Sequence, residues 1–567
     1  MLSDISPHLV TPDNPARETG ALDYHRCALL HNFLVEYGWV ASGRSLADME
    51  RRSFFEHYGD EANEMRARLE PGLIAFLEEA YVVQRSLFHF WVDGLTHPSG
   101  MWTNYECDDE GETLTIYSIN CGICSHSNGL MYHLRHHKAA MALSIFDMDC
   151  AQPFDDHPEL WHPLETVLSN WIHMIQLGKI TASPEESKTE TEQMGVWAWH
   201  SYGEAQVGNA VAAFDRLVEA IESRMPTESL RPAREGPLLS DDDLDAASIL
   251  GRCFVRGFLT QVRVPRFDFI APGLLVPHDS EAFVFSQAFT TIDTSCNDGV
   301  TVPPVLLFRA TDFTANFDTD EKWTRPNPFG RPYEVEKGDH SVPAGLYSES
   351  VDRSVWDSAE EGFRLVLPFS MGYGWDAGAK KSCGSKSERG VVADLFQHGY
   401  KPFGGEWWRA QRLERLFEKW TELVERGVWD VGERGVAGTV MKFGDADRGA
   451  WRDYQIAPTW GIRTLPPAPQ SPCNPAHHPT TANHHGTRQR PLLRSHATAP
   501  PRPGTPIRAR LHLAAPNLDL SLLPPTRGRR DHQPRDRVSA HGTGREDGSG
   551  AESGFGDWGG RFAGAWG

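Results

Sequence analysis

Apolar residues recur at helical spacing over much of the first half of the chain. Residues 22–92 carry two such stripes, from Leu29 to Tyr37 and from Leu73 to Phe90. Further stripes run through 162–177 and 207–221. Side chains three and four positions apart share one face of an α-helix. These stretches therefore predict amphipathic helices, each with one buried face.

Other stretches have the alternation or the β-branched composition that is typical of strands. Residues 113–119 alternate between apolar and polar side chains, and 141–146 form a short apolar run. In the second half of the chain, glycine, proline and aspartate separate short strand candidates, which lie at 267–270, 282–285, 305–308 and 363–367. A last helical stripe covers 407–424. The pattern predicts an α+β fold with a helical N-terminal half and a mixed, strand-rich second half.

Polar, proline-containing stretches divide this pattern into domains. Residues 226–245 are mostly polar and include three prolines and an Asp-Asp-Asp run, which predicts a linker. We therefore expect a mainly helical domain with a short sheet at 22–225 and an α+β domain at 246–460. Residues 1–21 precede the first stripe, and we expect a flexible N-terminus there.

The chain changes character after Trp460. Residues 461–567 hold 15 of the 39 prolines and 14 arginines but no lysine. Such a segment buries too little apolar surface to offset chain entropy, which predicts a disordered, basic C-terminal tail rich in Pro, Arg and His. Its abundant residues have GC-rich codons, so one hypothesis is a mistranslated segment. The alternative is a genuine basic linker.

Charge limits the classes of partner. The formal net charge is −22, and the tail contributes +7, so residues 1–460 carry −29. A body this acidic repels phosphate backbones and anionic membrane surfaces, which makes nucleic acid an unlikely ligand. The sequence shows no secretory signal, no apolar run of about 20 residues and no disulfide spacing among nine cysteines. We expect a soluble, cytoplasmic protein with reduced thiols and no membrane association.

The densest cluster of potential metal ligands follows the strand at 113–119. Cys121 and Cys124 are spaced to bind one zinc ion, and His133 and His137 would share a face if they were helical. Eight residues separate Cys124 from His133, whereas a finger-type site has about twelve. The alternative is a pair of free thiols beside solvated histidines.

A second candidate site follows the apolar run at 141–146. It ends in Asp147-Met148-Asp149, which resembles the first motif of the haloacid dehalogenase-like phosphatases. The resemblance implies that Asp147 is the nucleophile, that Asp149 is the general acid or base, and that magnesium bridges to phosphate. Lys442 and Asp445 loosely resemble the later metal-binding motif. The alternative is a buried strand that ends in an acidic turn.

Three longer segments carry a broader resemblance. Residues 157–172, 202–207 and 451–460 resemble uncharacterised proteins of filamentous ascomycete fungi, a group without an assigned activity. This resemblance implies no catalytic residue. It favours an accessory intracellular fungal protein, associated with a specialised-metabolite biosynthetic pathway. The alternative is a metal-dependent hydrolase or phosphatase that uses Asp147 and Asp149.

Overall fold

The computed structural model describes most of the chain up to Ala457. The described ranges are 1–83, 87–102, 111–120, 129–142, 154–155, 158–184, 192–292, 301–316, 328–329, 341–353, 358–372, 378–387, 391–399 and 411–457. The predicted tail at 461–567 lies outside them. None of the helices within these ranges combines the length and the apolar character that crossing a bilayer requires.

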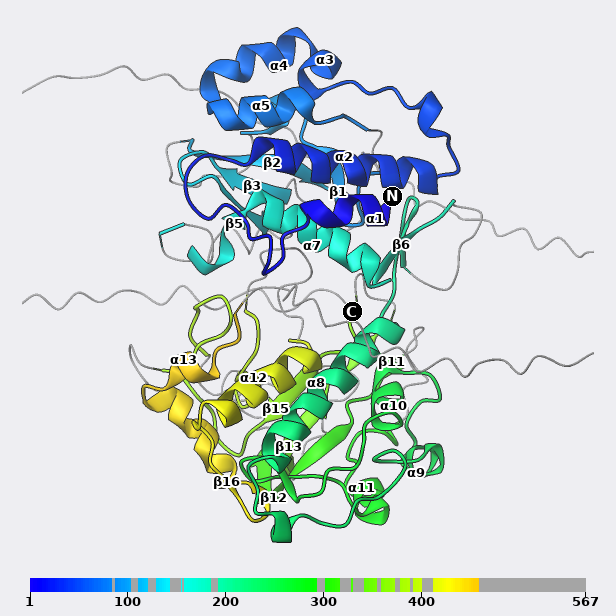
Figure 1. Ribbon diagram of the computed structural model, residues 1–567, viewed down its shortest axis with the longest axis vertical. Coiled ribbons are helices and arrows are strands. Elements are labelled where there is room, and N and C mark those ends of the chain that lie inside the picture. The colour runs from blue at the N-terminus through cyan, green and yellow to red at the C-terminus, as the bar shows by residue number, and fades with distance from the viewer. Residues whose placement is uncertain are drawn as a thin grey trace, which may run out of the picture. The chain divides into compact units, whose positions relative to one another are not determined.

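Two large hydrophobic cores organise these residues (Figure 1). The N-terminal core is formed by buried side chains between Ile5 and Trp199, and the C-terminal core by buried side chains between Val207 and Ile456. The division differs from the predicted one, because helix α8 (Glu204–Glu222) packs in the C-terminal core. The stretch predicted as a linker also contributes Leu238 and Leu244 to that core.

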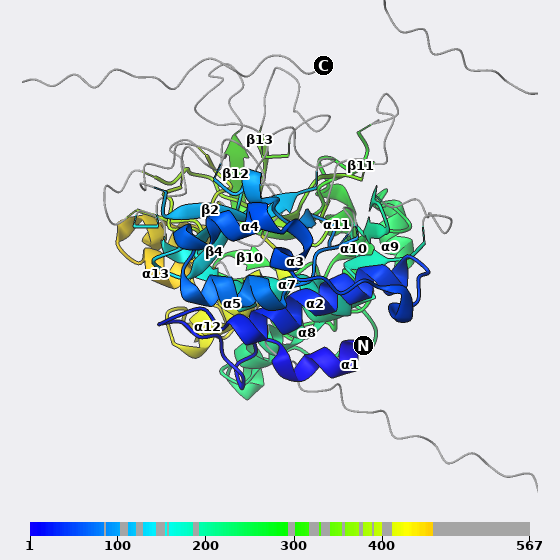
Figure 2. The same cartoon turned by 90° about the horizontal axis from the view of Figure 1, so that it is seen from above.

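Helices and two antiparallel sheets build the N-terminal core. Its main helices are α1 (Leu2–Ile5), α2 (Tyr24–Ala41), α3 (Phe54–Tyr58), α4 (Asp60–Glu64), α5 (Pro71–Glu79) and α7 (Leu164–Gln176). A five-stranded sheet has the order β1 (Val92–Leu95), β2 (Thr113–Ile119), β3 (Gly129–His133), β4 (Lys138–Ala142) and β5 (His162–Pro163). A three-stranded sheet has the order β6 (Ile180–Ala182), β8 (Trp197–Trp199) and β7 (Glu192–Met194). Helix α2 packs against both α5 and α7 (Figure 2).

A seven-stranded sheet and the helices against it build the C-terminal core. The sheet order is β15 (Phe363–Val366), β13 (Ser341–Ser348), β12 (Leu306–Asn316), β10 (Leu274–Leu275), β9 (Phe269–Ala271), β17 (Gly435–Val436) and β16 (Val431–Gly432). A separate two-stranded sheet pairs β11 (Thr301–Val302) with β14 (Val351–Asp352). The helical elements are α8, α9 (Asp241–Ala246), α10 (Phe254–Leu259), α11 (Ser280–Phe285), α12 (Leu413–Glu425), the 3-10 helix η8 (Val440–Arg448) and α13 (Trp451–Tyr454).

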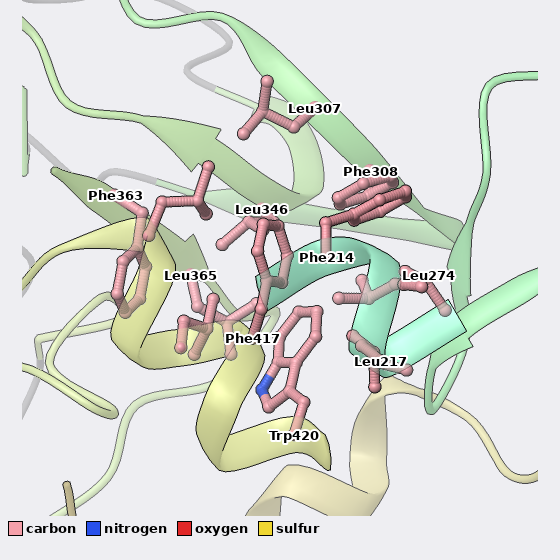
Figure 3. Close-up of a cluster of buried hydrophobic side chains, with 14 of the residues drawn as sticks. Phe214, Leu217, Leu274, Leu307, Phe308, Leu346, Phe363, Leu365, Phe417 and Trp420 are labelled. Atoms are coloured by element: carbon pink, nitrogen blue, oxygen red, sulfur yellow. The ribbon is translucent and has the colours of Figure 1, made fainter. Parts of the chain in front are cut away.

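Aromatic side chains fill the space between α8, α12 and the large sheet (Figure 3). Phe214 of α8 meets Phe417 of α12 with 5.4 Å between ring centroids, and Phe417 lies 6.0 Å from Trp420. The apolar residues of α12 recur at three- and four-residue spacing, so its apolar face enters the core. Its charged side chains must consequently lie on the opposite face.

The predicted α+β class is confirmed: helices dominate the N-terminal region and strands the middle of the chain. One predicted strand is wrong, because 282–285 belongs to α11. The Asp279 side chain accepts a hydrogen bond from the backbone N–H of Ala282, 3.1 Å away, and this N-cap favours the helix. The second helical stripe is shorter than predicted, since α5 ends at Glu79.

Gly38 permits a close backbone contact inside the N-terminal core. A Cβ atom there would lie 1.7 Å from the carbonyl oxygen of Leu87 and 3.3 Å from the Trp197 ring. We expect Gly38→Ala to lower the free energy of unfolding by about 1–3 kcal/mol, although alanine is the better helix former.

Gly208 in α8 is the matched control for this prediction, since nothing lies within 4 Å of the position that a Cβ atom would take there. Gly208→Ala should raise the free energy of unfolding by about 0.5–1 kcal/mol. Urea denaturation of both variants is the measurement. Equal effects of the two substitutions would contradict the close contact at Gly38.

Candidate functional site

The two histidines among the predicted zinc ligands do not share a helix face. Cys121 and Cys124 lie outside the described residues. His133 ends β3, and His137 lies in the hairpin turn before β4 with φ 53°. The helical spacing assumed for the two histidines is therefore wrong, because both belong to a β-hairpin.

The ring nitrogens of the two histidines also contact different side chains. His133 Nε2 lies 4.0 Å from a Glu112 carboxylate oxygen. His137 Nδ1 lies 3.4 Å from the Tyr132 hydroxyl and 3.7 Å from Glu70. Zinc binding by these residues stays a prediction that depends on the two cysteines.

The predicted phosphatase nucleophile and acid, Asp147 and Asp149, also lie outside the described residues. Lys442 and Asp445, the loose match to the later motif, lie on η8 and form an ion pair at 2.8 Å on the surface. Within the described part of the chain, no group of three or more His, Cys, Asp or Glu side chains is placed to hold a metal ion. The magnesium site therefore also stays a prediction.

The structure contains a cavity of about 760 Å³ with walls from both cores. One wall is α7, a second is the segment 10–18, and a third is α12 with the residues 455–457 that follow α13. This volume lies within the range of about 300–1,000 Å³ that is usual for small-molecule sites. The cavity is therefore the candidate site.

Helix α7 presents hydrogen-bonding groups to the cavity. Thr166 and Asn170 are four positions apart and so lie one turn apart on one face of the helix. Asn170 is only 2% exposed, and neither its amide nitrogen nor its amide oxygen has a hydrogen-bond partner within the described ranges. The Thr166 hydroxyl oxygen is also buried without such a partner.

The segment 10–18, here called the strap, is fastened to the same helix. The backbone N–H of Val10 donates to Ser169 Oγ at 3.0 Å, and that of Arg17 donates to Glu165 Oε1 at 2.8 Å. Glu165 and Ser169 are the immediate neighbours of Thr166 and Asn170 in the sequence. The strap thus lies beside the unpartnered groups and is held in place independently of them.

A single arginine of α2 stabilises the shape of the strap. The Arg26 guanidinium donates to the carbonyl oxygens of His8, Asn14 and Pro15 at 2.8, 3.0 and 2.9 Å. The sequence predicted a flexible N-terminus over 1–21. The structure places this segment in defined contact with α2 and α7.

The α12 wall carries charges of both signs that compensate one another. Glu418 accepts from Arg216 of α8 at 3.4 Å and lies 3.6 Å from Arg415. Lys419 donates to Glu422 at 3.0 Å. The cations on this wall are already engaged by carboxylates, so the wall does not form a simple anion site.

Burial also sets the protonation of groups around α7. Burial lowers the pKa of His162 to about 4, against a smaller raising effect from Glu18, so the imidazole is neutral at pH 7. Burial raises the pKa of Glu165, which holds the strap, and the backbone N–H of Arg17 partly counteracts that rise. The cavity side of α7 therefore presents mostly neutral hydrogen-bonding groups.

A comparison with protein-family models, curated proteins and solved structures found no match to this chain. The candidate site thus depends on its geometry alone. Sequence reasoning did not single out Thr166 or Asn170, because polar residues opposite an apolar stripe are usually solvated. No local signal in the sequence distinguishes a solvated face from one that another core covers.

Proposed function

We propose that this protein binds a small polar molecule in the cavity between α7, the strap and α12. One observation carries the proposal: both amide atoms of Asn170 are buried at the cavity wall without a partner in the described part of the chain. Such a binding role is compatible with a non-enzymatic accessory function. The fungal resemblance and the phosphatase hypothesis for Asp147 and Asp149 stay predictions.

A buried donor or acceptor without a partner destabilises the folded state by about 1–3 kcal/mol. Buried polar groups in native proteins are nearly always hydrogen-bonded, and exceptions need a specific explanation. A ligand that pairs with Asn170 would supply both missing bonds, which explains why an asparagine occupies this position.

The test compares Asn170, whose side-chain amide has no partner among the described residues, with an asparagine whose amide is hydrogen-bonded. Asn170→Leu removes unpartnered polar atoms and is expected to raise the free energy of unfolding by about 1–2 kcal/mol. The control is Asn32, whose amide donates to the carbonyl oxygen of Glu79 at 2.9 Å and accepts from the backbone N–H of Tyr81 at 2.9 Å. Asn32→Leu should lower the free energy of unfolding by about 1–3 kcal/mol.

Urea denaturation of the full chain measures both changes. If Asn170→Leu destabilised the protein as Asn32→Leu does, Asn170 would have a structural role, and the proposal would lose its basis. A higher free energy of unfolding in Asn170→Leu would support the proposal, because functional sites commonly contain residues that lower the stability of the fold.

A further inference from the structure

We infer that the ligand is an uncharged, peptide-like molecule that presents amide groups to Asn170 and Thr166. This inference rests on the proposed binding function and deepens it. Two features of the cavity support it: the hydrogen-bonding needs of the unpartnered atoms of α7, and the apolar and charged side chains of the other walls.

Asn170 needs a donor and an acceptor side by side. Its side chain has an NH₂ that donates and a carbonyl oxygen that accepts, and neither has a partner among the residues described. A carboxylate or phosphate only accepts, so it would leave the carbonyl oxygen unpaired. An ammonium group only donates, so it would leave the NH₂ unpaired. A primary amide has both functions on one edge and satisfies both atoms, whereas the N–H and C=O of a trans peptide bond point in opposite directions.

Thr166 defines a second contact along the ligand. It precedes Asn170 by four residues, which corresponds to about 6 Å along the helix axis. In an extended peptide, groups that point the same way recur every two residues, or about 6.8 Å. The hydroxyl of Thr166 can therefore meet a second amide of the same molecule, because a hydroxyl both donates and accepts.

The other walls favour an uncharged, non-aromatic ligand. The strap contributes aliphatic surface from Val10, Pro12 and Pro15, and Ile456 adds to it. Apart from the His162 imidazole, no aromatic ring lines the described walls. Nucleobases that also carry a donor–acceptor edge are usually held by stacking on aromatic rings. The ion pairs of α12 already compensate its cations, so they do not require an anionic ligand.

Saturation-transfer NMR with the full chain tests this inference. The probe is N-acetylglycylglycinamide, which carries no charge and has its first amide two residues before its terminal primary amide. Acetate, glycerol and adenosine are tested in parallel as an acceptor-only ion, a vicinal diol and a nucleoside. We expect saturation transfer to N-acetylglycylglycinamide alone, and a roughly tenfold or greater loss of affinity in Asn170→Leu. The Gly208→Ala variant, whose change lies away from the cavity walls, should bind as the unmodified chain does.

The outcomes separate the two proposals. Binding of glycerol, adenosine or acetate without binding of N-acetylglycylglycinamide would overturn the amide inference and leave the binding function standing. Absence of any N-acetylglycylglycinamide signal would also overturn it, while the stability of Asn170→Leu independently decides the proposed function. Binding that survives Asn170→Leu would place the amide elsewhere and contradict the inference.

Discussion

Replacing Lys179 with methionine is expected to lower the free energy of unfolding by about 3–5 kcal/mol. Lys179 is 1% exposed, and its ammonium group donates to Glu361 at 2.9 Å and to the carbonyl oxygen of Ser201 at 2.7 Å. The ammonium nitrogen also lies 5.0 Å from the centre of the Trp199 ring. Removing the lysine leaves the Glu361 carboxylate buried without its cation, and that desolvated charge accounts for the size of the effect.

The ion pair between Lys179 and Glu361 contributes this much to the free energy of unfolding because it joins the two cores. Lys179 directly precedes β6 of the N-terminal core, whereas Glu361 precedes β15 of the C-terminal core. Two further hydrogen bonds join the same segments. The Trp199 indole N–H donates to the carbonyl oxygen of Ser358 at 2.5 Å, and the backbone N–H of Glu360 donates to the carbonyl oxygen of Ser201 at 3.0 Å. Loss of the ion pair should therefore weaken the connection between the cores.

A double variant and a surface control complete this experiment. Lys179→Met combined with Glu361→Leu should recover most of the lost free energy, because no unpaired charge is left in the interior. Lys442→Met removes an exposed partner of Asp445 and should cost less than about 1 kcal/mol. Urea denaturation curves give all three values. An effect of Lys179→Met no larger than that of Lys442→Met would show that the buried pair contributes little.

Periodicity predicted the elements well where one face of an element is buried. The stripe at 162–177 became α7 (Leu164–Gln176), and the alternation at 113–119 coincides with β2. In both cases the local pattern and the tertiary packing favour the same structure. The residues that fill the cores were likewise recognisable as the apolar members of these patterns.

The features that the sequence did not predict depend on packing between segments that lie far apart in the chain. Helix α8 was predicted as a helix, but its apolar stripe does not indicate which core covers it. The strap has no periodicity, and its place depends on Glu165 and Arg26, which lie outside it in sequence. Asn170 had no signal at all, because the sequence does not show that other elements bury a polar position of α7.

The candidate sites from sequence depend on residue type and local spacing. A shared ligand face for His133 and His137 requires a helix, whereas a tight turn places them at the end of a hairpin. Alternation of apolar and polar positions between 129 and 142 is weak, so helix and hairpin could not be separated there. The proposed ligand site instead lies where residues of both cores line one cavity.

Acidification from pH 7 to pH 5 is expected to lower the free energy of unfolding through two buried histidines. Burial lowers the pKa of His31 to about 4 and that of His89 to about 3, although backbone hydrogen bonds partly oppose the shift. In the unfolded chain both would titrate near a pKa of about 6.5. Between about pH 6.5 and pH 4 the unfolded state thus binds more protons, so stability falls as the pH falls. Each histidine should contribute roughly 2 kcal/mol at pH 5.

The surroundings explain why neither histidine accepts a proton readily in the folded state. The His31 Nε2–H donates to the Tyr81 carbonyl oxygen at 2.8 Å, so Nδ1 accepts from the Tyr117 hydroxyl at 2.9 Å. Protonating Nδ1 would require the Tyr117 hydroxyl to accept where it now donates, and it would create a charge in the core. The His89 ring stacks on Trp171 with 5.0 Å between centroids, in an equally buried position.

His89→Phe isolates one of these contributions, because phenylalanine keeps an aromatic ring against Trp171 and cannot bind a proton. The difference in unfolding free energy between pH 7 and pH 5 should shrink by roughly 2 kcal/mol relative to the unmodified chain. His25→Phe is the control, since the His25 side chain is 67% exposed. Urea denaturation at both pH values measures each difference. An unchanged pH dependence in His89→Phe would mean that His89 is protonated as easily in the folded state as in the unfolded one, which contradicts its burial among tryptophans.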